Sequence, residues 1–228
     1  MPGAVLRCLL LSQGPEWVVV DVATGALVRS RASGWPAAKT ATTGDNGARA
    51  GTNGGARPDR TYALDVVDIE LGTDDEPPDP SRPEAVMVRG APQRVGAPRR
   101  RAVRRILKDL LPVDPKRPLL GSLGPSIAYE DLDGSRPSVA VVAPDRPPIF
   151  VSDAAGVSCQ FTLGGRKHRL PVLDARVAES VPGARASALG TEAVSRAIGG
   201  PPRYLVIALG APRRGQAPKL VLSVLPRP

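Results

Sequence analysis

Apolar residues in the first ninety positions come in short runs, without the spacing of helices. Val- and Leu-rich runs at Ala4–Leu11 and Glu16–Val22 are separated by Ser-Gln-Gly-Pro, a pattern typical of two strands joined by a turn. A short third strand is expected at Ala26–Arg29, and strand-like runs recur at 62–71 and Glu84–Val88. The pattern predicts a small N-terminal β-meander.

A long polar stretch interrupts this N-terminal unit. From Ser30 to Arg60 the sequence consists largely of Ala, Gly, Thr, Asn and Pro, and residues 40–56 include no large apolar side chain. Such a segment cannot offset the entropy cost of ordering by burying apolar surface. We therefore expect a disordered insertion at about residues 32–58.

The clearest helical pattern covers Pro98–Leu111. Its apolar residues share one helical face and are Val103, Ile106, Leu107, Leu110 and Leu111. Pro98 suits the start of a helix, and Pro112 ends it. The basic residues on the rest of the helix are Arg100, Arg101, Arg104, Arg105 and Lys108. We predict an amphipathic helix with a strongly basic outer face.

After this helix, most apolar runs again have the length of strands. They lie at Ser138–Val142, Ile149–Val151, Val157–Leu163, His168–Leu173, Tyr204–Leu209 and Leu220–Leu225. Gly164 and Gly165 indicate a hairpin turn, and Thr191–Ile198 has the flanking residues of a short helix. The expected fold class is therefore α+β and β-rich, with a mostly antiparallel second sheet covered by the two helices.

The expected division of the chain is a β-rich unit at residues 1–90 and a basic α+β unit at 91–228, and both can share one core. Charge supports a boundary there. Residues 1–90 hold 9 Lys and Arg against 12 Asp and Glu, whereas residues 91–228 hold 22 against 10. The positive charge thus belongs to the second part, where RNA, DNA or an acidic protein surface is the expected partner.

Composition limits the chemistry that the chain can perform. One histidine, His168, and two cysteines, Cys8 and Cys159, cannot build a histidine or cysteine metal cage, and we expect no metal and no cofactor. Both cysteines lie in apolar runs, which favours buried, inert thiols, and His168 is expected on the surface or at a strand edge. No apolar run is long enough for a membrane span, so a cytoplasmic protein without a membrane partner is expected.

One short segment resembles the motif of a known enzyme family. Residues Tyr129–Ser135 read Tyr-Glu-Asp-Leu-Asp-Gly-Ser, which resembles the first motif of the haloacid-dehalogenase-like phosphotransferases. The resemblance implies a nucleophile at Asp131, a general acid/base at Asp133 and Mg²⁺ between carboxylates. It covers about seven residues, and no later Gly-Asp-x-x-x-Asp element follows. The alternative is a β-turn in which aspartates bond to local main chain and Gly134 has positive φ.

The absence of a motif for a reaction favours a non-enzymatic binding module over an enzyme, with no catalytic residue assigned. The expected polyanion-binding residues come from three basic segments and are Arg100, Arg101, Arg104, Arg105, Lys108, Arg166, Lys167, Arg169, Arg213, Arg214 and Lys219. Few aromatic residues accompany them, so contact with a phosphate backbone is expected, without base stacking. The alternative function is a metal-dependent enzyme of phosphoryl transfer or hydrolysis centred on Asp131 and Asp133.

Overall fold

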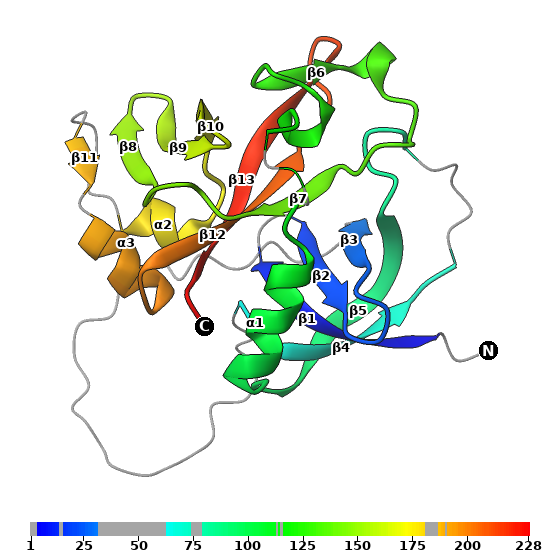
Figure 1. The fold of residues 1–228 in the computed structure, drawn as a ribbon. Helices are drawn as coiled ribbons and strands as arrows, with labels where there is room; N and C mark the ends of the chain where they lie inside the picture. The colour runs from blue at the N-terminus through cyan, green and yellow to red at the C-terminus, as the bar shows by residue number, and fades with distance from the viewer. Residues whose placement is uncertain are drawn as a thin grey trace, which may run out of the picture.

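The computed structural model describes residues 4–13, 16–31, 63–73, 79–112, 114, 116–180, 187–189 and 191–228, which form a barrel and two further sheets (Figure 1). The insertion expected at 32–58 lies outside the described residues. The prediction of a β-rich α+β fold is confirmed.

Five strands close into a barrel in the order β1-β2-β3-β5-β4. They are β1 (Val5–Gln13), β2 (Trp17–Asp21), β3 (Leu27–Arg31), β4 (Val66–Leu71) and β5 (Ala85–Gly96). The expected meander is wrong, because β4 pairs with β1 and β3 runs parallel to β5. Cys8, Val19, Val67 and Ile69 fill the interior, where a void of about 10 Å³ remains. This void is about the size of one water molecule.

A central antiparallel sheet packs against the outside of the barrel. In spatial order, its strands are β6 (Ser126–Ala128), β13 (Gln216–Pro226), β12 (Pro202–Leu209) and β7 (Val139–Val142). One apolar cluster joins Leu9 and Val18 of the barrel to Val206 and Leu222 of this sheet. β1, β2, β12 and β13 are thus buried on both faces, which explains why each reads as an almost continuous apolar run.

The other face of the central sheet packs against a third sheet. Its strands, in order, are β10 (Arg166–Pro171), β9 (Gly156–Leu163), β8 (Ile149–Asp153) and β11 (Ser187–Leu189). Phe150 and Phe161 share an apolar cluster with Leu205 and Ile207 of β12. The hairpin predicted between β9 and β10 is confirmed, with φ of 55° at Gly164 and 80° at Gly165.

The helices occupy the margins of these layers. They are α1 (Arg100–Asp109), α2 (Ala175–Glu179) and α3 (Thr191–Ile198), with one-turn 3₁₀ segments η1 (Leu119–Gly121) and η2 (Tyr129–Asp131). The helices expected at Pro98–Leu111 and Thr191–Ile198 are thus confirmed, the first somewhat shorter, whereas α2 was not predicted. Among the described helices, none has the length and apolar character to cross a bilayer.

Candidate polyanion-binding surfaces

The predicted basic face of the helix is exposed on α1. We call Arg100, Arg101, Arg104, Arg105 and Lys108 the α1 basic surface, and all five are exposed. Val103 and Leu107 on the opposite face are buried in the cluster that joins the barrel to the central sheet. This apolar contact fixes the position of the helix against the body of the protein. The five basic side chains therefore project from a backbone that is held in place.

The cations of α1 have no carboxylate partner among the described residues, in contrast to several arginines elsewhere. Arg7 pairs with Asp68 at 2.9 Å, and Arg94 pairs with Asp65 at 2.8 Å. Within the part of the chain that the structure describes, the α1 basic surface makes no ion pair, and its one side-chain hydrogen bond runs from Arg104 Nε to the main-chain oxygen of Pro228 at 2.7 Å. The surface thus presents several uncompensated charges to solvent.

This arrangement works against the stability of the helix itself. Arg101 and Arg105 are like charges four residues apart, a spacing that destabilises a helix by about 0.2–0.5 kcal/mol per pair. The first turn contains no acidic residue, and no side chain caps the helix at Arg99. Cations at this end also oppose the positive pole of the helix dipole. A bound anion would relieve both effects.

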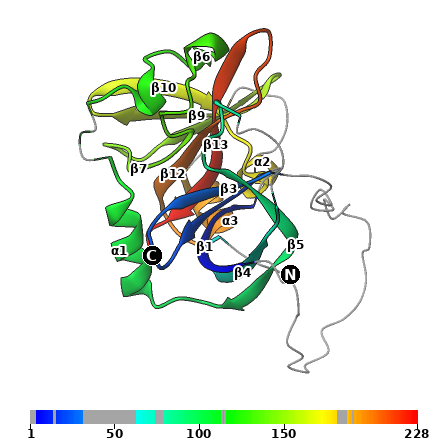
Figure 2. The same cartoon turned by 90° about the vertical axis from the view of Figure 1, so that its right-hand side faces the viewer.

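The other two basic segments lie at the far end of the molecule from α1. Figures 1 and 2 both place β10 and the β12–β13 turn beyond the central strands, whereas α1 lies beside the barrel. Arg166 and Lys167 of β10 are exposed, as are Arg213 and Arg214 in the turn. The structure therefore does not bring the three segments together on one surface with α1.

Two residues of these distant segments are already engaged. Arg169 donates through Nη2 to Asp153 at 2.7 Å and through Nε to Ser158 Oγ at 3.1 Å. Lys219, expected among the polyanion-binding residues, lies in β13 and is fully buried. Its Nζ donates to the carbonyl oxygens of Ser122 at 2.5 Å and Gly124 at 2.7 Å. The placement of Lys219 on a binding surface is therefore wrong, because loop carbonyls cover the amine.

Burial controls the titration of the remaining candidate groups. It lowers the pKa of Lys219 to about 8 and raises the pKa of both Cys8 and Cys159 to about 12. The prediction that both thiols are buried is confirmed. His168 lies on the edge strand β10 as expected and stacks on Phe161 with ring centroids 5.0 Å apart. Partial burial, followed by the charges of Lys219 and Arg166, lowers the pKa of His168.

The Asp131–Asp133 segment forms a turn. Asp133 Oδ1 accepts hydrogen bonds from Ser135 N at 2.9 Å and Ser135 Oγ at 2.6 Å, and Gly134 has a φ of 75°. These bonds, with a smaller effect of Arg136, lower the pKa of the exposed Asp133 carboxyl. Asp133 thus bonds to local main chain and Gly134 has positive φ, as the turn interpretation expects, whereas Asp131 belongs to the 3₁₀ segment η2. No group of three or more His, Cys, Asp or Glu residues that could hold a metal ion occurs in the described ranges.

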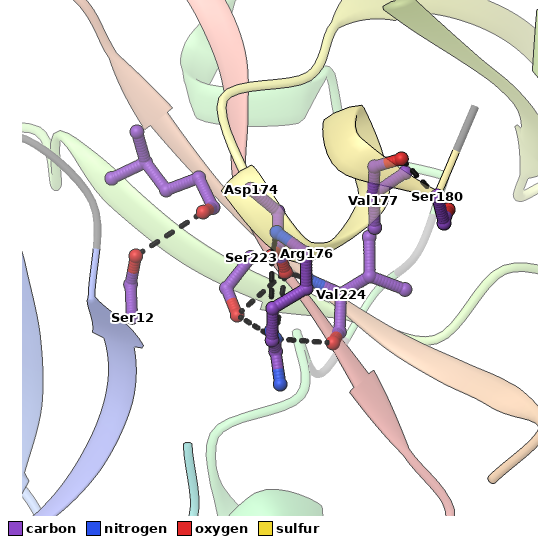
Figure 3. A network of polar contacts seen from close by, with 8 residues as sticks. Ser12, Asp174, Arg176, Val177, Ser180, Ser223 and Val224 are labelled. Atoms are coloured by element: carbon purple, nitrogen blue, oxygen red, sulfur yellow. Dashed lines mark hydrogen bonds and ion pairs between the residues drawn. The ribbon is translucent and has the colours of Figure 1, made fainter. Parts of the chain in front are cut away.

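A buried polar network at α2 stabilises the join between this helix and the central sheet (Figure 3). The Asp174 carboxylate accepts from Val224 N at 2.8 Å and from Arg176 Nη2 at 2.7 Å. It also caps α2 by accepting from Arg176 N, and Arg176 in turn donates to the carbonyl oxygen of Val224. In the same region, Ser12 Oγ of β1 donates to the carbonyl oxygen of Leu222 at 3.2 Å. The carboxylate of Asp174 and the guanidinium of Arg176 are both paired with groups of the protein itself, so we interpret this network as structural.

A second polar network joins the barrel to the central sheet through Arg29, whose side chain is only 1% exposed. Arg29 pairs with Glu16 and donates to the carbonyl oxygen of Leu209 at 2.6 Å and to Ser138 Oγ at 3.1 Å. Ser138 Oγ donates to Glu84 at 2.6 Å, and Arg82 Nη1 contacts the other oxygen of Glu16 at 2.5 Å. These charges neutralise one another inside the protein.

The outer face of the barrel is unavailable for a ligand at β1 and β2. Small barrels such as the OB-fold bind oligonucleotides over the face of strands 2 and 3. Here the outward side chains Val18 and Val20 are buried against α1 and the central sheet, and Arg29 of β3 is buried too. Nucleic acid would have to bind elsewhere, and α1 is the exposed basic element next to this covered face.

Comparison of the chain with models of protein families, with curated proteins and with solved structures finds no match. The candidate surfaces are therefore assigned from their own geometry and charge.

Proposed function

We propose that the protein is a non-enzymatic binding module whose α1 basic surface contacts the phosphate backbone of a nucleic acid. The observation that carries the proposal is the set of exposed cations on α1 without a carboxylate partner among the described residues. Paired arginines elsewhere have their charge compensated within the chain. The cations of α1 remain available to an external anion.

The dimensions of α1 suit a backbone contact. Ten helical residues span roughly 15 Å, and a DNA duplex carries one phosphate charge per roughly 1.7 Å of its axis, so several phosphates lie within reach. Binding of this type depends on electrostatic attraction to the phosphates and has no preference for a nucleotide sequence. The expected dissociation constant for such non-specific binding is about 10⁻⁴–10⁻⁶ M at physiological salt. A short helix with five cations belongs at the weak end of that range.

The test is a fluorescence-anisotropy titration of labelled duplex DNA and single-stranded RNA across a salt series. The variant combines Arg101→Glu, Arg105→Glu and Lys108→Glu, three exposed residues whose side chains make no hydrogen bond within the described part of the chain. All three side chains are exposed, and Glu at position 101 is near the helix start, where an acidic residue favours the dipole, so this variant is expected to fold. It should reduce the slope of log K against log salt by about 2–3, since each neutralised phosphate contributes about 0.9.

The matched control changes the same number of charges at the other end of the molecule, with Arg166→Glu, Arg213→Glu and Arg214→Glu. This control should retain most of the binding and most of the salt dependence. Equal losses in both triple variants would contradict a site on α1, because they would indicate a response to net charge. Tight binding to polyglutamate but not to DNA or RNA would also overturn the proposal and redirect it to an acidic protein.

A further inference from the structure

A cavity of about 530 Å³ opens between the segment that follows α1 and the edge of the central sheet. Its volume falls within the usual range of small-molecule pockets. η1 packs against β7 beside it. The apolar lining is contributed by Leu119 and Leu120 of η1, Ala140 and Val142 of β7, and Leu163 at the end of β9. The site is distinct from the α1 basic surface and does not rest on the proposed function.

The backbone of η1 is unusual where it forms the wall. Leu120 has a φ of 51° and a ψ of 31°, the left-handed region that a leucine rarely occupies. Gly121 follows with a φ of 82°. This pair of residues turns the chain so that Leu119 and Leu120 are both buried while Gly121 faces the mouth of the cavity. The local strain is thus located at the wall of the cavity.

The mouth of the cavity is charged. Arg117, Arg136 and Asp114 all line it, which leaves one positive charge in excess. Arg117 lies 4.0 Å from Asp114, so part of its charge is already compensated. Arg136 has no ion pair within the described ranges, and a Cβ added to Gly121 would lie 3.1 Å from its Nη1. The guanidinium of Arg136 therefore lies close to Gly121, where a β-carbon would make a tight contact.

We propose that this cavity binds an apolar molecule with a single carboxylate, of the kind represented by a medium-chain fatty acid. The apolar wall accommodates the hydrocarbon part, since burial of apolar surface is favourable. The planar guanidinium of Arg136 is matched to a carboxylate, to which it can donate two parallel hydrogen bonds. One excess positive charge at the mouth corresponds to a monoanionic head group.

The test is isothermal titration calorimetry with decanoate and decyltrimethylammonium below their critical micelle concentrations and with decanol below its solubility limit. These probes share one chain and differ in the head group. Decanoate should bind saturably, decanol roughly tenfold more weakly, since a charge-assisted hydrogen bond is lost, and the cation weakest of all. Failure of decanoate to bind saturably would overturn the proposal.

Two variants separate the roles of the mouth and the wall. Arg136→Gln should weaken decanoate roughly tenfold and leave decanol unchanged, and Ala140→Leu should weaken binding of both by occupying part of the apolar wall. Arg136 is exposed, so its variant is expected to fold, and circular dichroism checks both. Arg203→Gln removes an exposed arginine of β12 as a matched control and should bind like the unmodified protein.

Two results would contradict the assignment of the site. One is decanoate binding that Ala140→Leu leaves intact, and the other is an equal effect of Arg136→Gln and Arg203→Gln. The Arg101→Glu, Arg105→Glu, Lys108→Glu variant should keep its decanoate affinity. That measurement distinguishes failure of this proposal from failure of nucleic-acid binding, because the two use different residues.

Discussion

Replacement of Arg29 by methionine should destabilise the protein through the join between the barrel and the central sheet. Methionine retains much of the apolar stem but removes the guanidinium. The change deprives the carbonyl oxygen of Leu209 and the Ser138 hydroxyl of a donor and removes one cation from Glu16. Because all three groups lie at the join, water cannot readily replace the lost donor.

The size of the effect follows from the burial of the pair. Removal of one partner from a buried ion pair costs about 3–5 kcal/mol, chiefly because the other charge is left uncompensated. Glu16 is 15% exposed and keeps its contact with Arg82, so the lower end applies, and we expect about 3 kcal/mol. A second change, Glu16→Gln, removes the stranded charge. The double variant should therefore lose about 1–2 kcal/mol less than Arg29→Met alone.

Urea denaturation measures these differences. Trp17 in the barrel serves as the fluorescent reporter, in a Trp35→Phe background because the chain has 2 tryptophans. Arg7→Met is the matched control: it breaks the Arg7–Asp68 pair, whose side chains are 61% and 25% exposed, and should be far less destabilising than Arg29→Met. The reasoning is refuted if Arg29→Met is no more destabilising than this control, or if the double variant is as unstable as the single one.

Two further predictions concern buried polar groups. Burial holds the pKa of Lys219 at about 8, below its ordinary 10.5, so the unfolded chain binds more protons between these values. The stability of the unmodified protein relative to Lys219→Met should consequently rise by up to about 1.4 kcal/mol per pH unit from pH 8 towards 10, and a pH-independent difference in urea midpoints would contradict this. Asp174→Ala removes the cap of α2 and leaves Val224 N–H unpaired, at an expected cost of about 2–4 kcal/mol, whereas Asp174→Asn should cost less. Equal urea midpoints for the two Asp174 variants would show that the carboxylate's acceptor atoms contribute nothing.

The sequence predicted those helices and turns that are specified by neighbouring residues along the chain. α1 has an apolar stripe at helical spacing and prolines at both ends, and the β9–β10 hairpin has two glycines at its turn. By contrast, α2 has only five residues, too few for a period, and its cap Asp174 is held by Val224, fifty residues away. β5 continues to Gly96 through Pro92, a residue that normally argues against a strand.

Closure of the barrel could not be predicted from the sequence, for a different reason. The parallel pairing of β3 with β5 joins residues on either side of the long polar insertion, and no local pattern specifies it. The continuous apolar runs also conceal which side chains face inward, because Leu9 and Leu10 are equally buried, one outside the barrel and one inside.

The candidate sites also differ in whether their residues are close together in the sequence. The α1 basic surface could be read from the sequence because its residues are adjacent on one helix. Lys219 was misplaced because the carbonyls that cover it, at Ser122 and Gly124, come from a loop nearly a hundred positions earlier. The carboxylate-binding cavity had no sequence signal, since its lining is drawn from η1, β7 and β9.

The packing of the first strands against the last has a consequence for synthesis on the ribosome. Leu9, Leu11, Val18 and Val20 leave the ribosome early, yet their neighbours Val206 and Leu222 are made almost two hundred residues later. The barrel is complete only after β5 has been made to Gly96, about 125 residues before Leu222, and until Leu222 is made its outer apolar face stays uncovered. At about 5–20 residues per second, this interval lasts roughly 6–25 seconds, during which the nascent chain is open to aggregation and to chaperone binding.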